Sequence, residues 1–327
     1  MIAVYLLIFL LLLTLLVSGY CYYICFYSPS NRKEDPYEAM KGEQYEALLD
    51  GIFHCTRRME EAPCQYVTIR SWDGVQLSAR YYHHADGAPL LILFHGYRSM
   101  ALRDSAGGYS LGKKSGMNVL AVDQRAHGRS GGRTITFGIK ERKDCLSWIQ
   151  FANRKFGADT SIIISGLSMG AATVLMATGL TLPDNVAGVI ADCPYDSPAG
   201  IIQKVAAEEG YPPKLVYPFV RLGALLFGHF RLTETTALDA VSNSRTPILL
   251  IHGSDDRFVP CVMSETLATS NPLCSLHIFP NAGHGLSYTS DPKRYEAVVF
   301  SFLTSLPMLQ EHMKNSEYVQ NVLKGNL

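Results

Sequence analysis

The stretch Ser161-Ile-Ile-Ile-Ser-Gly166-Leu-Ser168-Met-Gly170 decides the fold, because it joins a short apolar run to a segment that favours a helix. Its last five residues have the pattern Gly-x-Ser-x-Gly, and Met169–Thr178 is apolar or small nearly all round, which predicts a buried helix. A sharp turn between strand and helix forces the residue at its apex into a strained backbone conformation and exposes its side chain. Ser168 occupies that apex, so the stretch predicts a serine nucleophile above the end of a sheet.

Similar apolar runs recur on both sides of this stretch, with helical segments between them. They are Leu90–Phe94, Asn118–Val122, Val186–Ile190, Ile248–Ile251 and Leu276–Phe279. Continuous apolar strands that alternate with helices predict a mostly parallel central sheet with helices on both faces, an α/β fold. A hairpin precedes them, because the strand-like segments 66–70 and 75–82 flank the turn signal Asp73-Gly74.

Two further helices are expected from periodicity. One covers about 139–156, with an apolar face and a charged face that includes Lys140 and Glu141. The other covers Pro292–Leu306, with proline in its first turn.

A region without a good strand separates two of the sheet strands. Residues 195–244 are punctuated by prolines, and an apolar stripe runs from Leu215 to Phe230, which predicts a small helical cap inserted in the sheet. The stripe has two interpretations. It packs against the body, which the pattern favours, or it lines an acyl pocket.

The segment Phe94-His95-Gly96-Tyr97 follows an apolar strand directly. Together with the serine turn, it makes the chain resemble the α/β-hydrolase superfamily over residues 66–305, and in particular its lysophospholipase-like and serine-aminopeptidase-like branch. The resemblance implies an oxyanion hole formed by the backbone N–H groups of Tyr97 and Met169, which would stabilise a tetrahedral intermediate. His95 is expected to brace the loop, because it stands after too early a strand to be the catalytic base.

Three more segments carry the resemblance. His252-Gly-Ser-Asp-Asp-Arg-Phe-Val-Pro260 is similar to the family pattern H-G-x-x-D-x-x-V-P, which selects Asp256 as the triad acid; Asp255 is the fallback and Asp192 a more distant alternative. His284 lies in Asn281-Ala-Gly-His-Gly285, a loop position that suits a general base. The order Ser168, Asp256, His284 is that of the family. Asp123–Ser130 resembles a family loop in which Arg125 and His127 brace turns.

These residues predict a serine hydrolase that forms an acyl-enzyme, with a carboxylic ester as the preferred substrate and a hydrophobic acyl or lipid-like character. No cofactor and no metal are implied. A peptidase or amidase of the same fold is the first alternative, and Glu208-Glu209 is its candidate anchor for a peptide terminus. A catalytically inactive, membrane-anchored binding module is the second, since a fold does not guarantee a function.

The N-terminus carries no charged side chain from Met1 to Tyr27 and is almost entirely apolar up to Val17. Its length predicts one transmembrane helix. A cleaved signal peptide is the rival interpretation, but a charged first region and a small-residue cleavage site are missing. Arg32 and Lys33 follow the segment, so the positive-inside rule predicts a cytoplasmic catalytic domain.

The expected organisation therefore has four parts. They are an anchor at 1–27, a connector at 28–64, a hydrolase domain at 65–306 that contains the cap, and a C-terminal tail at 307–327.

Composition excludes some other functions. The 29 Lys and Arg residues equal the 29 Asp and Glu residues, which argues against a nucleic-acid partner. The eight cysteines are scattered without C-x-x-C spacing, so no zinc site is expected and most should be free thiols. For Cys21 and Cys25, palmitoylation and burial of unmodified thiols are both open, with burial favoured.

Overall fold

The computed structural model describes residues 1–29, 35–38 and 43–326. Arg32 and Lys33, on which the predicted orientation depends, lie outside the described residues.

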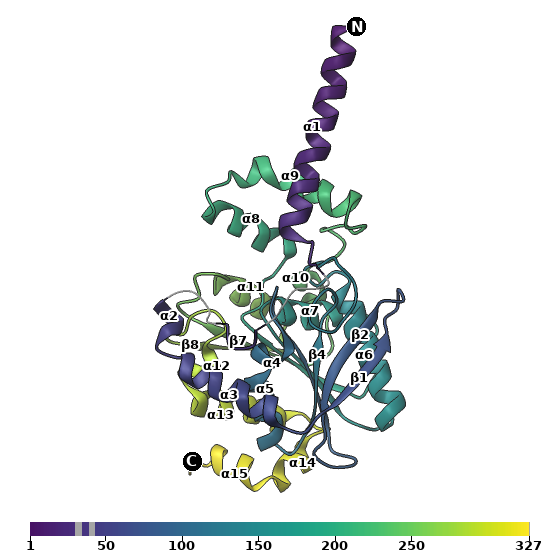
Figure 1. The fold of residues 1–327 in the computed structure, drawn as a ribbon. Helices are drawn as coiled ribbons and strands as arrows, with labels where there is room; N and C mark the ends of the chain where they lie inside the picture. Colours follow the sequence, from purple (N-terminus) through teal and green to yellow (C-terminus); the bar gives the residue numbers. More distant parts are fainter. Residues whose placement is uncertain (30–34, 39–42, 327) are drawn as a thin grey trace.

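Within the described residues, eight strands form one sheet in the order β1-β2-β4-β3-β5-β6-β7-β8. Strand β2 runs antiparallel to both β1 and β4, and the other neighbours are parallel, as the sequence predicts. The bounds are β1 Gln65–Arg70, β2 Gln76–Tyr82, β3 Leu90–Phe94, β4 Asn118–Asp123, β5 Ile162–Leu167, β6 Val186–Asp192, β7 Ile248–Gly253 and β8 Cys274–Phe279. All residues of β3, β4, β6 and β7 are buried, because helices cover both faces of the sheet (Figure 1).

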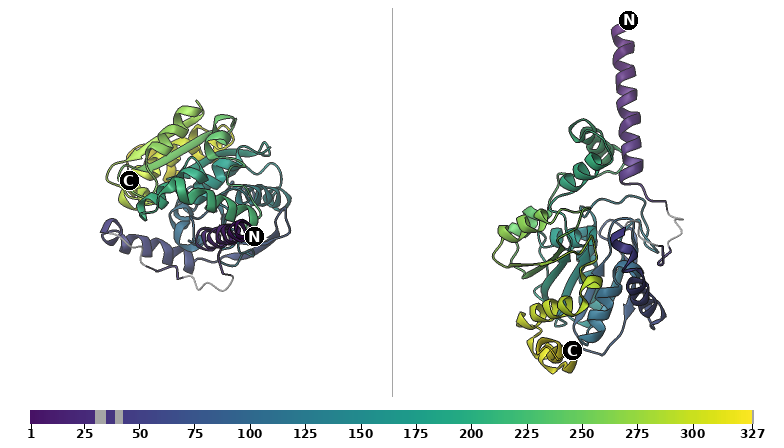
Figure 2. Two further views of the ribbon diagram at one scale, coloured as in Figure 1. Left: turned by 90° about the horizontal axis from the view of Figure 1, so that it is seen from above. Right: turned by 90° about the vertical axis from the view of Figure 1, so that its left-hand side faces the viewer.

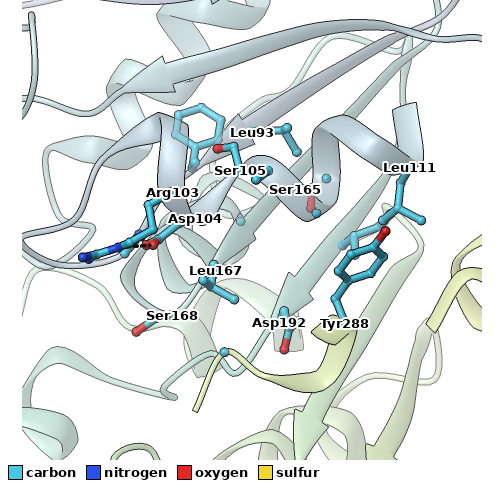
Figure 3. Close-up of a pocket in the computed structure, with 18 of the residues that line it drawn as sticks. Leu93, Arg103, Asp104, Ser105, Leu111, Ser165, Leu167, Ser168, Asp192 and Tyr288 are labelled. Atoms are coloured by element: carbon cyan, nitrogen blue, oxygen red, sulfur yellow. Dashed lines mark hydrogen bonds and ion pairs between the residues drawn. The ribbon is translucent and has the colours of Figure 1, made fainter. Parts of the chain in front are cut away.

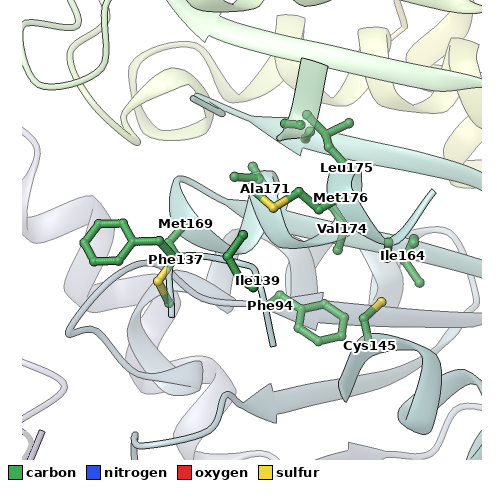
Figure 4. Close-up of a cluster of buried hydrophobic side chains, with 14 of the residues drawn as sticks. Phe94, Phe137, Ile139, Cys145, Ile164, Met169, Ala171, Val174, Leu175 and Met176 are labelled. Carbon is green, nitrogen blue, oxygen red and sulfur yellow. The ribbon is translucent and has the colours of Figure 1, made fainter. Parts of the chain in front are cut away.

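Two hydrophobic clusters hold these helices on the sheet, one on each face. The first cluster includes residues of α6 (Glu141–Phe156), α7 (Met169–Ala177) and α11 (Val262–Ser270). The second includes residues of α3 (Leu49–Glu61), α4 (Ala101–Asp104), α5 (Ala106–Lys114) and α13 (Pro292–Ser305). Every residue of α7 is buried, as its sequence predicts, and Figure 4 shows its side chains packed among those of the sheet and of α6.

One part of the prediction for α6 is wrong. Glu141 was expected on the charged, exposed face, yet only 1% of it is exposed. Its carboxylate accepts hydrogen bonds from the backbone N–H groups of Thr136 (2.8 Å) and Gly138 (3.0 Å). The helix begins at Glu141, so a carboxylate in its first turn satisfies donors of the preceding loop that helix periodicity does not reveal.

The cap contains α8 (Pro198–Glu208) and α9 (Pro213–Leu226), followed by α10 (Ala237–Ser242), which lies beside α7. Helix α9 packs on the N-terminal helix α1 (Ile2–Cys25), as the two views of Figure 2 show. A Cβ atom at Gly223 would collide with the carbonyl oxygen of Ser18, and the rings of Tyr22 and Phe227 are 5.9 Å apart. The apolar stripe of the cap therefore packs partly against α1.

Helix α1 projects from the body at its N-terminal end and is bound to the body at its C-terminal end (Figure 1). It is the one helix in the described part of the chain that is long and apolar enough to cross a membrane. Phe26, just after it, is fully buried, with the rings of Phe137 and Phe230 packed edge-on against it. The Tyr22 hydroxyl is hydrogen-bonded to the Thr134 hydroxyl at 2.7 Å. The end of this apolar segment is thus part of the folded core.

The segments expected as connector and tail also pack on the body. The first contains α2 (Glu43–Glu46) and α3, and Met59 of α3 is fully buried. The second forms α14 (Gln310–Asn315) and α15 (Glu317–Leu323), which bury Met313 and Val319. All eight cysteines are free thiols, which agrees with the prediction that most of them are unpaired.

Candidate active site

Ser168 lies between the last residue of β5 and the first residue of α7. Its φ and ψ angles are 55° and −115°, a conformation that side-chain-bearing residues rarely adopt. The flanking glycines permit it, because a Cβ atom at Gly166 would collide with the backbone of Gly170, and one at Gly170 with that of Phe94. The strained turn predicted from the sequence is therefore present, and it places the serine at the N-terminus of a buried helix.

His284 joins Ser168 to Asp256. Its Nε2 atom lies 2.9 Å from the Ser168 Oγ atom, and its Nδ1 atom lies 2.7 Å from Oδ2 of Asp256. Since a carboxylate only accepts, Nδ1–H donates and Nε2 is left to accept the serine proton. The three residues come from the loops after β5, β7 and β8, whose C-terminal ends lie at one edge of the sheet.

The Asp256 carboxylate is buried but well supplied with donors. Its Oδ1 atom accepts the backbone N–H groups of Phe258 (2.9 Å) and Val259 (2.8 Å), and His252 Nε2 lies 3.3 Å from Oδ2. Burial raises the pKa of Asp256, but the hydrogen bonds from His252, His284 and the backbone outweigh burial, so its pKa falls well below the ordinary range. Asp256 is therefore ionised at neutral pH.

The two alternative acids do not contact His284. Asp255 is exposed, and its carboxylate accepts from the hydroxyl of Ser254. Asp192 is buried and accepts from the Tyr295 hydroxyl (3.0 Å) and, more weakly, from Ser287 (3.4 Å). Burial raises the pKa of Asp192 to about 6.

The loop after β3 reaches Ser168 from the other side. The Gly96 N–H donates to Oδ2 of Asp104 at 2.8 Å, and a Cβ atom at Gly96 would be 3.5 Å from that of Ser168. His95 braces this loop as expected, because its Nδ1–H donates to the Gly96 carbonyl and its Nε2 accepts from the Gln124 N–H. The Tyr97 hydroxyl donates to the carbonyl of Cys25 at the end of α1 (2.9 Å).

The neighbouring loop after β4 is braced in the same way. His127 Nε2 accepts from the backbone N–H of Arg98 at 3.0 Å. The Arg125 guanidinium forms ion pairs with Asp144 (2.6 Å) and Asp73 (2.9 Å), joining α6 to the β1–β2 hairpin. The bracing roles predicted for Arg125 and His127 are confirmed.

A cavity of about 270 Å³ leads from Ser168 and His284 under α5. Figure 3 shows Leu93, Ser165 and Asp192 of the sheet facing Leu111 and Tyr288 across this space. Its other apolar walls come from β3, α3 and α13 and are formed by Leu91, Ile52, Cys55, Val299 and Leu303. Residues of α8 and α9 do not line it among those described, so the acyl-pocket interpretation of the cap is not supported.

Three residues of the connector contribute to the site and were not predicted. Ile52 and Cys55 of α3 line the cavity, and the Tyr45 hydroxyl donates to the backbone carbonyl of His284 at 3.1 Å. The amphipathic spacing of Ile52, Cys55 and Met59 predicts a packed helix, but the sequence does not show which face of the sheet it covers.

One group of potential metal ligands is found in the described part of the chain. Ligand atoms of Cys193, Asp256 and His284 lie within 4.8 Å of one another. The last two are already hydrogen-bonded to each other, and burial raises the pKa of the Cys193 thiol far above its ordinary value. A thiol is a poor ligand in its protonated form, so this geometry fits a catalytic pair better than a metal site.

Comparison with known proteins identifies the family of the chain. The model of the alpha/beta hydrolase family matches residues 91–298. The uncharacterized protein YqkD of Bacillus subtilis is 31% identical over 257 residues, which are 78% of this chain and 83% of that protein. Human protein ABHD12B is 26% identical over 200 residues, or 56% of this chain and 49% of that protein.

Solved structures show the same fold. The esterase Pf2001 of Pyrococcus furiosus, in one crystal form, has a TM-score of 0.59 at 25% identity, covering 76% of this chain and 93% of that one. Est1E of Butyrivibrio proteoclasticus, solved with ferulic acid, has a TM-score of 0.56 at 21% identity, covering 73% and 98%. The family match spans the sheet from β3 to β8 and the segments that carry Ser168, Asp256 and His284. The chain therefore belongs to the alpha/beta hydrolase family.

Proposed function

We propose that the protein is a membrane-anchored serine esterase that hydrolyses carboxylic esters with a hydrophobic acyl chain. The observation that carries the proposal is the continuous set of hydrogen bonds from Ser168 through His284 to Asp256 at the mouth of a largely apolar cavity. A nucleophile, a neutral base and an ionised acid in this order are the requirements for acyl transfer through a covalent intermediate.

The reaction follows from the positions of these atoms. Ser168 Oγ attacks the ester carbonyl while its proton passes to Nε2 of His284. The ester C–O bond then breaks, the alcohol leaves with that proton, and the acyl group stays on Ser168. Water next attacks the acyl-enzyme, gives a proton to His284, and the carboxylic acid departs as the proton returns to Ser168. The Asp256 carboxylate stabilises the imidazolium of His284 during both acylation and deacylation.

The backbone N–H groups of Tyr97 and Met169 are the proposed oxyanion donors. Met169 opens α7, so its N–H group belongs to a helix N-terminus, where developing negative charge is stabilised. Tyr97 belongs to the braced loop beside Ser168 and is among the residues that line the cavity.

The cavity supports the choice of an acyl substrate. Its volume of about 270 Å³ lies near the lower limit of ~300–1,000 Å³ for small-molecule sites, so it suits one narrow chain. Aliphatic side chains of β3, α3, α5 and α13 form the apolar part of its walls. No observation favours the peptidase alternative, because Glu208 pairs with Lys204 (2.6 Å) and does not line the cavity.

Helix α1 is the proposed anchor, with the catalytic domain on the cytoplasmic side. Its apolar residues up to Leu13 are exposed, as expected of a segment that contacts lipid. Burial of Phe26 supports a retained helix over a cleaved signal peptide, because cleavage before it would leave the rings of Phe137 and Phe230 without their partner.

The experiment that tests the esterase is turnover of nitrophenyl esters of increasing acyl length by the full-length protein in detergent micelles. Ser168→Ala is compared with wild type, and Ser242→Ala, a hydroxyl exposed on α10, is the matched control. We expect turnover in wild type and in the control, and none above background in Ser168→Ala.

Three outcomes contradict the proposal. Equal turnover by wild type and Ser168→Ala would remove the serine from its role. A folded wild type that turns over no ester but cleaves the matching anilides would favour the amidase. A folded protein that cleaves neither substrate, and does not react with a fluorophosphonate probe, would favour the binding module.

A further inference from the structure

We propose that helix α9 of the cap is embedded in the lipid bilayer beside α1, so that the protein enters the membrane with its cap as well as with its anchor. The proposal rests on α1 being the membrane anchor. The exposed apolar side chains of α9 then contact the acyl chains and head groups of the bilayer that α1 crosses.

The length of α1 is the first argument. The helix is free of the cap only up to about Val17, because Ser18 is against Gly223 and Tyr22 is against Phe227. From Ile2 to Val17 the helix rises about 24 Å at ~1.5 Å per residue. The hydrocarbon core of a bilayer is about 30 Å thick.

This free part is therefore too short to cross the bilayer by itself. The helix reaches the required length only near Tyr22, and any tilt shortens its projection further. If Ile2 lies at the far edge of the hydrocarbon, Ser18–Tyr22 lies within its near side. Helix α9 crosses α1 at this level, so it must lie there too.

The surface of α9 is the second argument, and it is independent of length. Its buried side consists of Val220, Gly223 and Ala224, whereas large apolar side chains are exposed on its other sides and just after its end. They are Leu215 (65% exposed), Leu225 (46%), Leu226 (41%) and Phe227 (42%). In water, several large apolar side chains exposed on one short helix are unfavourable, and such exposure is typical of an interaction site.

The charges of α9 suit a membrane surface. The helix contains Lys214 and Arg221, both exposed, and no acidic residue. A helix that combines leucines with lysine or arginine and lies in the plane of the interface buries its apolar face about 5–10 Å below the head groups. Figure 1 shows α9 in the layer of the body nearest the projecting part of α1, crossing that helix.

The contact between the two helices also fits a lipid environment. The crossing brings Ser18 of α1 against Gly223 of α9 and Gly19 against the ring of Phe227, and small residues permit close helix packing inside membranes.

The test uses tryptophan fluorescence of the full-length protein in vesicles whose phospholipids carry bromine at a shallow or a deep position of the acyl chain. Leu226→Trp and Leu215→Trp introduce the probe on α9, at positions that already tolerate exposure. Met308→Trp, which also replaces an exposed apolar residue (46%) but lies in the C-terminal region far from α1, is the matched control. Background from Trp72 and Trp148 is measured in the unsubstituted protein.

We expect shallow bromine to quench the added tryptophan of both α9 variants more strongly than deep bromine does, because an interfacial helix lies about 5–10 Å below the head groups. The control should not be quenched by either. Flotation of each variant with vesicles on a density gradient is measured in parallel. A protein that floats with an unquenched α9 probe would overturn the proposal while leaving the anchor intact. A protein that does not float would instead remove the anchor on which the proposal rests.

A second copy of the chain is the competing occupant of this face. It would keep both α9 probes unquenched, and it would give a dimer by multi-angle light scattering of the micelle-solubilised protein that Leu226→Glu converts to a monomer. That pair of results contradicts the proposal.

Discussion

At the scale of single residues, Asp256 has three kinds of donor around one carboxylate. Backbone N–H groups satisfy Oδ1, whereas His252 and His284 approach Oδ2. This arrangement keeps the carboxylate ionised and directs one lone pair to Nδ1 of His284. The hydrogen bond in turn fixes the tautomer in which Nε2 can accept the proton of Ser168.

Replacing Asp256 by asparagine should therefore lower kcat by about 10⁴-fold, the size of the effect for a triad acid, while changing the fold little. The amide has a similar shape but carries no charge, and its NH₂ group favours the wrong tautomer of His284. Asp255→Asn is the control, because that carboxylate is exposed and next in sequence. Comparable losses in the two variants, measured on one nitrophenyl ester, would contradict the assignment of Asp256.

The raised pKa of Asp192 should make the free energy of unfolding depend on pH. Burial raises its pKa to about 6, whereas a carboxyl group in an unfolded chain has a pKa of about 3.9. Between these values the folded state binds the extra proton, so the contribution of Asp192 to stability is lost as the pH rises through about 4 to 6 and stays absent above it. The loss is of order 3 kcal/mol.

Asp192→Asn should remove this loss, since the amide is neutral and can still accept from the Tyr295 hydroxyl. We expect the variant to be more stable than wild type at pH 8 and to approach it at pH 4. Thermal unfolding at several pH values measures the difference. A constant difference across that range would show that Asp192 does not titrate as inferred.

At the scale of secondary-structure elements, the cavity is formed by helices that come from distant parts of the chain. Helix α3 contributes Ile52, α5 contributes Leu111 and α13 contributes Leu303. A larger side chain on one of these helices should limit the length of acyl chain that the cavity accepts.

Ile52→Trp should reduce kcat/KM for long esters and leave short esters unaffected. Each methylene group excluded from the cavity forgoes ~0.8 kcal/mol, or about fourfold in binding. His54→Trp places the same side chain on an exposed position of the same helix, outside the cavity lining. A chain-length profile of Ile52→Trp that matches that of His54→Trp would mean that acyl chains do not occupy this cavity.

Truncating Phe26, the residue after α1, should lower the stability of the protein strongly. Phe26 is fully buried between Phe137 and Phe230, so Phe26→Ala should lower the free energy of unfolding by about 3–5 kcal/mol. Phe9→Ala, at an exposed position on the same helix, should have little effect in the same detergent. Thermal unfolding in micelles measures both, and equal stability of the two variants would show that the end of α1 is not part of the folded body.

The elements and residues predicted correctly from the sequence are those with a local signal. The parallel strands follow from short apolar runs, the first two strands follow from a hairpin turn signal, and the turn at Ser168 follows from glycines two residues to either side. The hydrogen bond from His284 to Asp256 is the one that the family resemblance implies. Glu141, in contrast, was misplaced because its partners are backbone N–H groups of a loop, which leave no periodic pattern.

The features that could not be predicted from the sequence are contacts between segments far apart in the chain. Helix α3 was expected only as part of a connector, although it forms a wall of the cavity, because its amphipathic pattern does not identify its partner. The sequence left two interpretations of the apolar stripe of the cap. Its contact with α1 is a third arrangement, which cannot be inferred from the sequence of the stripe or of α1 alone. Pairing of two apolar surfaces far apart in the chain requires the folded structure.

At the scale of the whole molecule, helix α1, the proposed anchor, is joined to the loop after β3 that carries a proposed oxyanion donor. The hydroxyl of Tyr97 donates to the Cys25 carbonyl, and the Arg98 guanidinium donates to the carbonyls of Ile24 (2.6 Å) and Tyr27 (3.2 Å). Carbonyl groups at the end of a helix have no partner within the helix, and an arginine there also interacts favourably with the helix dipole. The last turn of α1 thus holds the loop that carries the proposed oxyanion donor.

This connection predicts that helix α1 contributes to the proposed catalysis even with a soluble substrate. Deletion of residues 1–29 should lower kcat for a short ester by about 10-fold or more, because loss of an aligned oxyanion donor alone costs about 10²–10³-fold. Replacing the exposed residues 2–13 by a different apolar sequence of equal length should leave kcat unchanged, since that part of α1 does not contact the body. The kcat values of the two variants are measured with the same ester in the same detergent, and circular dichroism establishes that both are folded. If a folded deletion variant kept the activity of wild type, α1 would serve only to attach the enzyme to the membrane. If it lost activity and the replacement variant did not, the docked end of the helix would be part of the active enzyme.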